Sequence, residues 1–322
     1  MTMADVAARL GVHQATVSRA LTRPDAVRPA TRDRILDAVE ALGYVPNAGA
    51  RRLAGGSTGV VAVMVPDLAN PFFARLLKAL QRALTDSGSH MLVADTDLDP
   101  MSELELVRTF APNVDAVVLC SPVASTQKLQ EVAAERALVF VNRSATRVPS
   151  VSIDQKAIVE IGVDHLRQLG HRRIGVALGP SEYWSSAQRK KAATDLPGVT
   201  VFDDIAPTFA GGAAVFERLL SSGVSGVVAF NDLMALGMIS AAAASGCTVP
   251  GRLSVVGSDD NPDAAMATPA LTTVAAPLEA LAGEVVGAFL RASRDDMLKH
   301  PRRLLPVELV CRASTGPPLE GR

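Results

Sequence analysis

The sequence contains little that would indicate a secreted, membrane-bound or metal-stapled protein. Only three cysteines occur in 322 residues; they are far apart and odd in number, which argues against a disulfide framework and a zinc site. No apolar run reaches the ~18–20 residues that a membrane helix needs, and the first residues lack the basic and apolar regions of a secretory signal. We therefore expect a soluble, cytoplasmic protein that needs no metal or other cofactor.

Charge is distributed unevenly, although the net charge is only −1. Residues 1–58 contain eight arginines, no lysine and five acidic residues, a net charge of +3, whereas the remainder carries −4. A chain of this length also suggests more than one domain. The sequence thus indicates a small head that binds an anion, joined to a larger acidic body.

The first 45 residues have the pattern of three short helices. Thr2 and Asp5 have the spacing of a capping box, before a helix that Gly11 should end. A second helix is expected over about 14–21, and Thr31 should cap a third. Two short helices that meet at a glycine are typical of a helix-turn-helix, whose second helix enters the major groove of DNA. The expected DNA contacts here are Thr2, Gln14, Ala15, Thr16, Ser18 and Arg19.

From residue 58 the pattern changes to alternating strands and helices. Apolar runs typical of buried parallel strands occur at 60–65, 91–94, 116–119, 137–141, 174–178, 224–230 and 253–257. Amphipathic helices are expected between most of them, at 72–84, 157–169, 213–220 and 232–245. This alternation predicts an α/β body with parallel sheets, in two lobes, with a ligand cleft at the carboxyl ends of the strands.

A simple alternative for the head is a three-helix domain with an ordinary polar surface. However, the segments 5–7, 11–12, 16–21 and 43–47 resemble the lac repressor (LacI/GalR) family of bacterial regulators, and the resemblance continues through nearly the whole chain. It implies a helix-turn-helix head and a two-lobed body like that of periplasmic binding proteins. It also implies a homodimer, with a tetramer left open, that binds double-stranded operator DNA and a small effector, expected to be a sugar or a sugar derivative.

On this basis we divide the chain into four parts. Residues 1–45 form the DNA-binding head, 46–57 a hinge helix or linker, and 58–312 the two-lobed domain for effector binding and dimerisation. The proline- and glycine-rich residues 313–322 are expected to form a flexible tail.

The resemblance implies that the hinge becomes helical in the minor groove when two subunits bind DNA together. Leu53 occupies the position of the family's leucine wedge, and Arg51 can neutralise a phosphate. Asn47 and Ala50 are the other expected hinge contacts. So short a helix is marginal in water on its own, so we expect the hinge to be disordered without a partner. The alternative is a plain linker.

Candidate effector-binding residues lie at strand ends or in the loops after them, and match pocket positions of the family. They are Phe72, Phe73, Asn142, Ser185, Arg189, Asn231 and Asp259. The two phenylalanines can also be core residues, and Asp259 can be a solvated loop carboxylate. Trp184 can either stack on a ligand or pack on a lobe surface, and we interpret His171 as a structural cap.

No G-x-S-x-G, H-E-x-x-H or P-loop motif occurs, so we do not expect an enzyme. We interpret the chain as a transcriptional regulator, most simply a repressor whose operator affinity an effector controls. The main alternative is a solute-binding protein of the periplasmic type without a role on DNA, and the third is an α/β enzyme.

Overall fold

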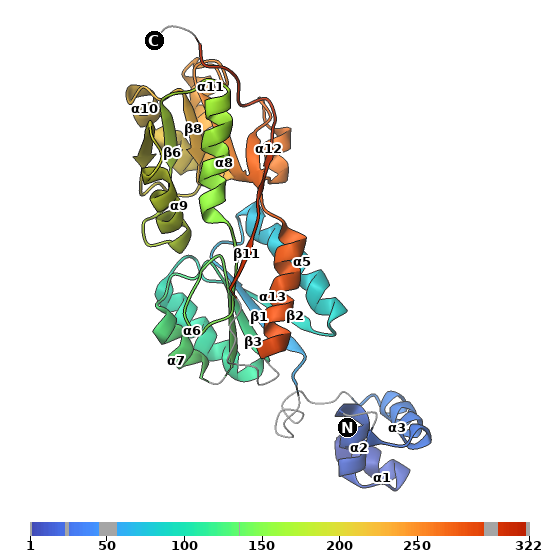
Figure 1. Cartoon of the computed structure of the whole chain (residues 1–322). Helices are drawn as coiled ribbons and strands as arrows, with labels where there is room; N and C mark the ends of the chain where they lie inside the picture. The colour runs from blue at the N-terminus through green and yellow to red at the C-terminus, as the bar shows by residue number, and fades with distance from the viewer. Residues whose placement is uncertain (1, 23–25, 45–56, 135, 293–301, 320–322) are drawn as a thin grey trace. The chain divides into compact units, whose positions relative to one another are not determined.

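The computed structural model describes residues 2–22, 26–44, 57–134, 136–292 and 302–319 (Figure 1). The chain folds into two compact units, one comprising Met1–Val60 with Asn113–Asp115 and the other Val61–Pro112 with Ala116–Arg322. The helices of the first unit are α1 (Met3–Leu10), α2 (Gln14–Thr22) and α3 (Pro29–Ala41).

Local capping explains where the helices of the head begin and end. Thr2 and Asp5 form the predicted capping box: the Asp5 N–H donates to Thr2 Oγ1 at 3.4 Å, and the Thr2 N–H donates to the Asp5 carboxylate at 2.7 Å. Gly11 adopts the left-handed conformation and ends α1 as expected. The prediction that Thr31 caps the third helix is wrong, because α3 already begins at Pro29, whose fixed φ and missing N–H suit the first helical position.

The head has a small core of its own. Val6, Val17 and Ile35, one from each helix, are fully buried, and Val12 and Leu21 pack against them. This cluster fixes the angle between α1 and α2, so the opposite face of α2 is left to solvent.

The larger unit contains two six-stranded sheets in two lobes. The N-terminal lobe has the strand order β11-β5-β4-β3-β1-β2, and the C-terminal lobe has β12-β10-β9-β8-β6-β7. The strands of the first sheet are β1 (Val60–Val65), β2 (His90–Asp95), β3 (Ala116–Cys120), β4 (Ala137–Val141), β5 (Ser150–Ile153) and β11 (Arg302–Leu305). Those of the second are β6 (Ile174–Ala177), β7 (Val199–Phe202), β8 (Gly226–Ala229), β9 (Ser254–Asp259), β10 (Thr272–Ala275) and β12 (Glu308–Val310). β12 pairs antiparallel with β10, whereas the neighbouring pair of β9 and β10 is parallel, as predicted for the body.

Helices accompany both sheets (Figure 1). Those of the N-terminal lobe are α5 (Pro71–Asp86), α6 (Pro100–Phe110), the short η2 (Ala111–Asn113), α7 (Thr126–Ala133) and α13 (Leu278–Ala292). Those of the C-terminal lobe are α8 (Gln155–Gln168), α9 (Trp184–Thr194), α10 (Phe209–Ser221), α11 (Asp232–Ala244) and α12 (Pro262–Met266). One apolar core includes α5 and α13 together with α8, and a second lies under α10 and α11. Among the described residues, no helix is both long and apolar enough to cross a membrane.

The chain passes between the lobes three times. It crosses from β5 into α8, from β10 into α13, and from β11 to β12. Because of these crossings, residues at the ends of strands from both sheets meet in the space between the lobes.

The segment after β12 is packed, which differs from the flexible tail expected from residue 313. Ser314 is fully buried, and its hydroxyl donates to the Val255 carbonyl at 2.6 Å and accepts the Thr272 N–H at 2.8 Å. His171 Nε2 lies 2.9 Å from the Gly316 carbonyl oxygen, and its Nδ1 lies 2.8 Å from Ser225 Oγ. The expectation is therefore wrong for residues 313–316, because small and polar side chains fit this segment against β9 and β10. These contacts also give His171 the structural role that we expected.

Candidate functional site

The exposed face of α2 presents the residues expected to contact DNA. Gln14, Ala15 and Arg19 are exposed, whereas Thr16 and Ser18 are half-buried. The Arg19 side chain lies along the helix, because its Nε donates to the Ala15 carbonyl at 3.1 Å. Thr2 is exposed at the start of α1. The other four expected contacts, Asn47, Ala50, Arg51 and Leu53, lie outside the described residues.

His13 directly precedes α2, at a position where serine, threonine, aspartate and asparagine are the common residues. Its Nδ1 accepts the N–H of Ala15 at 3.2 Å, while its backbone carbonyl accepts the N–H of Thr16 at 2.8 Å. A ring nitrogen can accept this bond only when it carries no proton, so the cap requires the neutral imidazole with its proton on Nε2. An imidazole therefore does the work that a hydroxyl usually does at a helix start.

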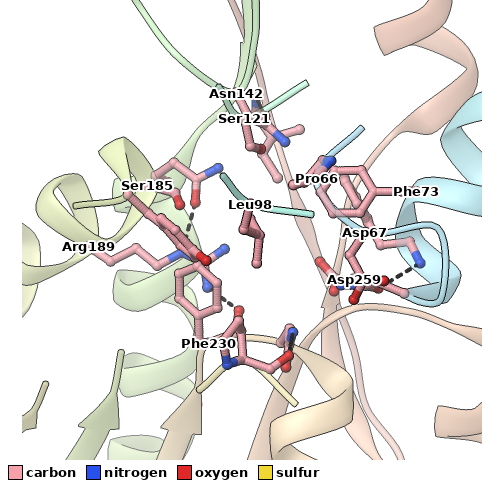
Figure 2. Close-up of a pocket in the computed structure, with 17 residues that line it drawn as sticks. Pro66, Asp67, Phe73, Leu98, Ser121, Asn142, Ser185, Arg189, Phe230 and Asp259 are labelled. Carbon is pink, nitrogen blue, oxygen red and sulfur yellow. Dashed lines mark hydrogen bonds between the residues drawn. The ribbon is translucent and has the colours of Figure 1, made fainter. Parts of the chain in front are cut away.

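A cavity lies between the two lobes, and all seven residues expected at the effector site line it (Figure 2). The sequence did not point to the remaining ten lining residues, which are Pro66, Asp67, Asn70, Leu98, Ser121, Ile153, Gln155, Tyr183, Pro207 and Phe230. The seven residues therefore meet in one cavity, as the strand-end rule predicts.

Aromatic rings form much of the wall. The rings of Phe72 and Phe73 meet edge to face, with 5.2 Å between centroids, at the start of α5. Asn70 caps this helix, because its Oδ1 accepts the Phe72 N–H at 3.0 Å. Both phenylalanines also belong to the core, so the two roles proposed for them are compatible. From the other lobe, Tyr183 and Phe230 lie with 6.5 Å between ring centroids.

Asn142 supplies an uncharged polar group directly after β4. Its backbone N–H donates to the Val151 carbonyl at 3.0 Å, and its Oδ1 accepts the Ile153 N–H at 3.2 Å. The neighbouring Arg143 instead donates to the Pro122 carbonyl at 2.8 Å and the Ala124 carbonyl at 2.6 Å. Arg143 therefore fixes the loop before α7, and the cavity has an amide at this position.

Arg189 is a buried cation held by the protein itself. Its Nε donates to Gln155 Oε1 at 2.7 Å, and one terminal nitrogen donates to the Phe230 carbonyl at 2.5 Å. The guanidinium also lies over the Phe230 ring, 4.7 Å from its centroid. Burial lowers the pKa of Arg189 to about 10, and the nearby Asp259 carboxylate opposes that shift. The guanidinium remains charged at neutral pH.

Asp259 ends β9 on the opposite side of the cavity from Arg189 (Figure 2). Burial and the neighbouring Asp232 raise the pKa of Asp259 well above its usual value, while Arg189 and Arg75 act in the opposite direction. Burial also raises the pKa of Asp232 to about 6, although its carboxylate accepts the Thr273 hydroxyl at 2.5 Å. The buried carboxyl group of Asp259, which lines the cleft, therefore has a second buried carboxyl group, that of Asp232, as its neighbour. Asp259 is not a solvated loop residue.

An arginine of the N-terminal lobe, Arg75, contacts the backbone at Asp259. Arg75 on α5 donates to the backbone carbonyls of Asp259 at 3.0 Å and Asp260 at 2.6 Å. These bonds join α5 of the N-terminal lobe to the end of β9 in the C-terminal lobe. Sequence reasoning missed Arg75, because its spacing on α5 is that of any helix-surface residue.

The two remaining expected residues, Asn231 and Ser185, lie at the beginnings of helices next to the cleft. Asn231 caps α11, because its Oδ1 accepts the Met234 N–H at 2.8 Å, and its Nδ2 donates to the Pro207 carbonyl at 2.8 Å. Ser185 lies in the first turn of α9 and is buried. Trp184, one residue earlier, does not line this cavity. Of the residues that the sequence missed, Leu98 and Ser121 follow β2 and β3, so a stricter use of the strand-end rule would have found both.

Two protein-family models match the chain, one in the head and one in the body. Residues 2–47 match the family described as bacterial regulatory proteins, lacI family, and residues 163–315 match the periplasmic binding protein-like domain. The transcriptional regulator DegA of Bacillus subtilis is 30% identical over 98% of this chain and 98% of its own length. The regulator MalR of Streptomyces coelicolor is 34% identical over 98% of this chain and 96% of its own. The repressor CytR of Escherichia coli is 30% identical over the same shares of the two chains.

Solved structures give the same result. The lac repressor dimer bound to operator and the anti-inducer ONPF superposes with a TM-score of 0.83 at 26% identity, over 98% of this chain and 99% of that chain. A complex of the regulator CelR with cellobiose has a TM-score of 0.71 at 28% identity over the same shares. Likeness over almost the full length of these proteins means that this chain belongs to the LacI family of bacterial transcriptional regulators, with a DNA-binding helix-turn-helix head and an effector-binding body.

Proposed function

We propose that this protein is a homodimeric repressor that acts in the cytoplasm, and that a small molecule in the cleft lined by Arg189 and Asp259 controls its operator affinity. The observation that carries this proposal is the cavity itself. Seven residues from strand ends and from the helices that follow strands, far apart in sequence, line one space between the lobes. Such convergent polar groups in a largely apolar cleft are typical of a ligand site.

The effector that fits best is a sugar derivative or a similar small ring compound. Phenylalanine and tyrosine side chains offer flat apolar faces, and Asn142 and Asp259 offer hydrogen-bond partners from different lobes. Among similar solved structures, one holds cellobiose and another holds ribose. In this chain the cleft is lined by Phe72, Phe73, Tyr183 and Phe230, which favours a ligand with an apolar face.

The DNA contacts come from the head and the hinge. We assign base and phosphate contacts to Thr2, Gln14, Ala15, Thr16, Ser18 and Arg19, and hinge contacts to Asn47, Ala50, Arg51 and Leu53. The exposed positions of Gln14, Ala15 and Arg19 on α2 support the first set. The hinge set rests on the resemblance of residues 46–56 to the family. We keep the division of the chain into head 1–45, hinge 46–57 and body from 58, with the body now extended through the packed segment 313–316.

Ligand binding controls DNA binding only through a difference in affinity between two states. A molecule that bridges the lobes favours one relative position of the lobes in each subunit. In a dimer this changes the spacing of the two hinges and so their fit to the operator. The family consists of transcriptional regulators, which are not enzymes, and we propose that the cleft binds its ligand without converting it.

Two measurements test this function. First, the full-length protein is titrated against labelled DNA from upstream of its own gene and against random DNA of equal length, with fluorescence anisotropy as the readout. Preference for the upstream DNA is expected, and equal affinity for both would contradict the proposal. Second, a thermal-shift screen of neutral sugars, sugar phosphates and nucleosides identifies ligands of the cleft. A ligand that raises Tm must also change operator affinity, whereas one that binds without any effect on DNA would favour a solute-binding protein.

A further inference from the structure

A second cavity lies on the other side of Gln155. It measures roughly 370 Å³, compared with about 80 Å³ for the cleft. Its lining includes Ser152, Gln155, Lys156, Trp184, Gln188 and Arg302. Among the described residues, Gln155 alone lines both cavities.

Both lobes contribute to this cavity. The N-terminal lobe supplies β5 and β11, which pair in parallel with Ser150 opposite Arg302 and Ser152 opposite Leu304. Because side chains alternate along a strand, these four residues share one face of the sheet. The C-terminal lobe supplies the first turn of α8 and the start of α9, with Lys156, Trp184 and Gln188. A bound molecule would therefore touch both lobes where β5 crosses into α8.

Ser152 provides the first indication that the cavity takes a ligand. Its side chain is 4% exposed, and its Oγ is buried without a hydrogen-bond partner among the described residues. A buried hydroxyl without a partner is costly, so polar groups of this kind are normally satisfied by protein, water or a ligand. By contrast, the neighbouring Ser150 hydroxyl donates to the Val148 carbonyl at 2.9 Å.

The charged groups around the cavity are not equivalent. Asp154 is acidic, and its Oδ1 accepts the N–H groups of Lys156 and Ala157, each at 3.0 Å. Lys156 pairs with Glu160 at 3.2 Å, and Arg303, on the opposite face of β11, pairs with Glu284 at 3.5 Å. Arg302 is different, since its contact is a long one of 3.5 Å to the Thr146 hydroxyl, and no carboxylate in the described part of the chain lies within ion-pair distance. Its guanidinium therefore keeps most of its capacity to bind an oxyanion.

Trp184 supplies a flat apolar surface beside these polar groups. It is half-buried and lines this cavity rather than the cleft. An indole face, a hydroxyl, an amide and a guanidinium together suit a polyhydroxylated ring that carries one anionic group.

We propose that this cavity is a second binding site, for a small sugar-like ring that bears a phosphate or a carboxylate. The Trp184 indole stacks on the ring, Ser152 and Gln188 bond its hydroxyl groups, and Arg302 binds the anion. The site communicates with the cleft through Gln155, whose Oε1 accepts the hydrogen bond from Arg189 at 2.7 Å. A ligand that moves Gln155 therefore changes the position of a side chain that lines the cleft.

The protein carries its own reporter for this site, because Trp184 is the only tryptophan of the chain. Full-length protein without DNA is titrated with glucose 6-phosphate, with glucuronate and with glucose, and tryptophan fluorescence is recorded. A saturable change is expected with one or both anionic sugars, and the two arms distinguish a phosphate from a carboxylate ligand. Glucose should bind at least about tenfold more weakly, as expected when a charge-assisted bond is lost. No saturable change with either anion, or equal affinity for glucose, would overturn the proposal.

Variants place the ligand in one cavity or the other. Arg302→Ala should weaken binding about tenfold or more and Ser152→Ala about threefold to tenfold, whereas Lys128→Ala, which removes an exposed charge on α7, should leave the affinity unchanged. Ser152→Ala should not lower Tm, because it removes a hydroxyl that has no partner. A signal that survives Arg302→Ala but disappears in Asp259→Asn would put the ligand in the cleft and overturn the proposal. The experiment needs neither operator nor cleft effector, so it succeeds or fails independently of the proposed function.

Discussion

The side chains of Arg189 and Gln155 join two cavities through one hydrogen bond of 2.7 Å. Gln155 begins α8 directly after the chain crosses between the lobes, and Arg189 lies one turn into α9. Arg189 also holds the Phe230 carbonyl at the end of β8. This arginine therefore has two roles, one in the shape of the C-terminal lobe and one in the wall of the cleft.

The first prediction concerns Arg189→Ala. The substitution removes the donor to Gln155 Oε1 and the Phe230 carbonyl, so the free energy of unfolding should fall by about 1–3 kcal/mol. Effector affinity should fall by about 2–5 kcal/mol, as for truncation of one partner in a buried polar contact. Operator affinity without effector should remain that of the parent. Urea unfolding and anisotropy with and without effector measure these effects.

Arg189→Lys is the control for charge in this experiment. Lysine keeps a cation but cannot supply the two fork-like donors, so its effects should be intermediate. A full effector response in Arg189→Ala would show that the ligand binds elsewhere.

The second prediction concerns the pH dependence of stability through Asp232. Its pKa is about 6 in the folded protein, above the usual 3.8, so the folded state binds more protons than the unfolded state between these values. The contribution of this group to stability is therefore greatest below about pH 4 and is lost as pH rises to about 6. The loss amounts to about 3 kcal/mol above that window.

Asp232→Asn should remove most of this dependence. The amide keeps one acceptor for the Asn261 N–H, and the Thr273 hydroxyl can turn to accept from the amide nitrogen. Unfolding by urea at pH 4.5, 6 and 7.5 should show a flatter profile for the variant and higher stability than the parent at pH 7.5. Asp263→Asn, an exposed change on α12, is the control. If the stability of Asp232→Asn changed with pH as much as that of the parent, the pH dependence would not come from Asp232.

Apolar patterning predicted the strands that consist of apolar residues and missed several strands that contain serine, threonine or arginine. The runs at 60–65 and 137–141 coincide with β1 and β4, because these strands are buried on both faces and read as continuous apolar segments. β10 was missed, since Thr272 and Thr273 are polar yet fully buried, and their burial depends on bonds from other segments. The exposed β11, with two arginines, has no apolar pattern at all.

The same limit applies to the site. Asn142, Asn231 and Asp259 could be predicted, because the carboxyl ends of parallel strands converge at one edge of a sheet. Gln155 could not, since a glutamine next to a helix start has the appearance of an ordinary surface residue. Its importance comes from Arg189, which lies 34 positions further along the chain. Similarly, nothing local to Trp184 indicates which of two cavities its side chain lines.

The third prediction compares two glycines of the body. A Cβ at Gly257 would overlap Asp232 Oδ1 and would lie 2.8 Å from a methyl group of Leu271. Gly257→Ala should therefore lower the free energy of unfolding by about 1–3 kcal/mol. A Cβ at Gly283 on α13 would meet no atom within 4 Å, so Gly283→Ala should raise the free energy of unfolding by about 0.5–1 kcal/mol. Thermal unfolding of both variants checks the sign, and a shift in the same direction for both would contradict this account.

The last prediction tests the head through Arg19→Ala. Arg19 is exposed on α2. We propose that its guanidinium contacts a base edge, so the variant should lose about 1–3 kcal/mol of operator affinity while random DNA binds nearly as before. Arg34→Ala removes the same charge from an exposed position on α3 and is the control. Because a phosphate contact is independent of sequence, any loss in the control should be equal for both DNAs. Anisotropy titrations at one fixed salt concentration measure all four affinities. Equal losses on operator and random DNA for Arg19→Ala would mean that Arg19 binds the backbone and does not read the sequence.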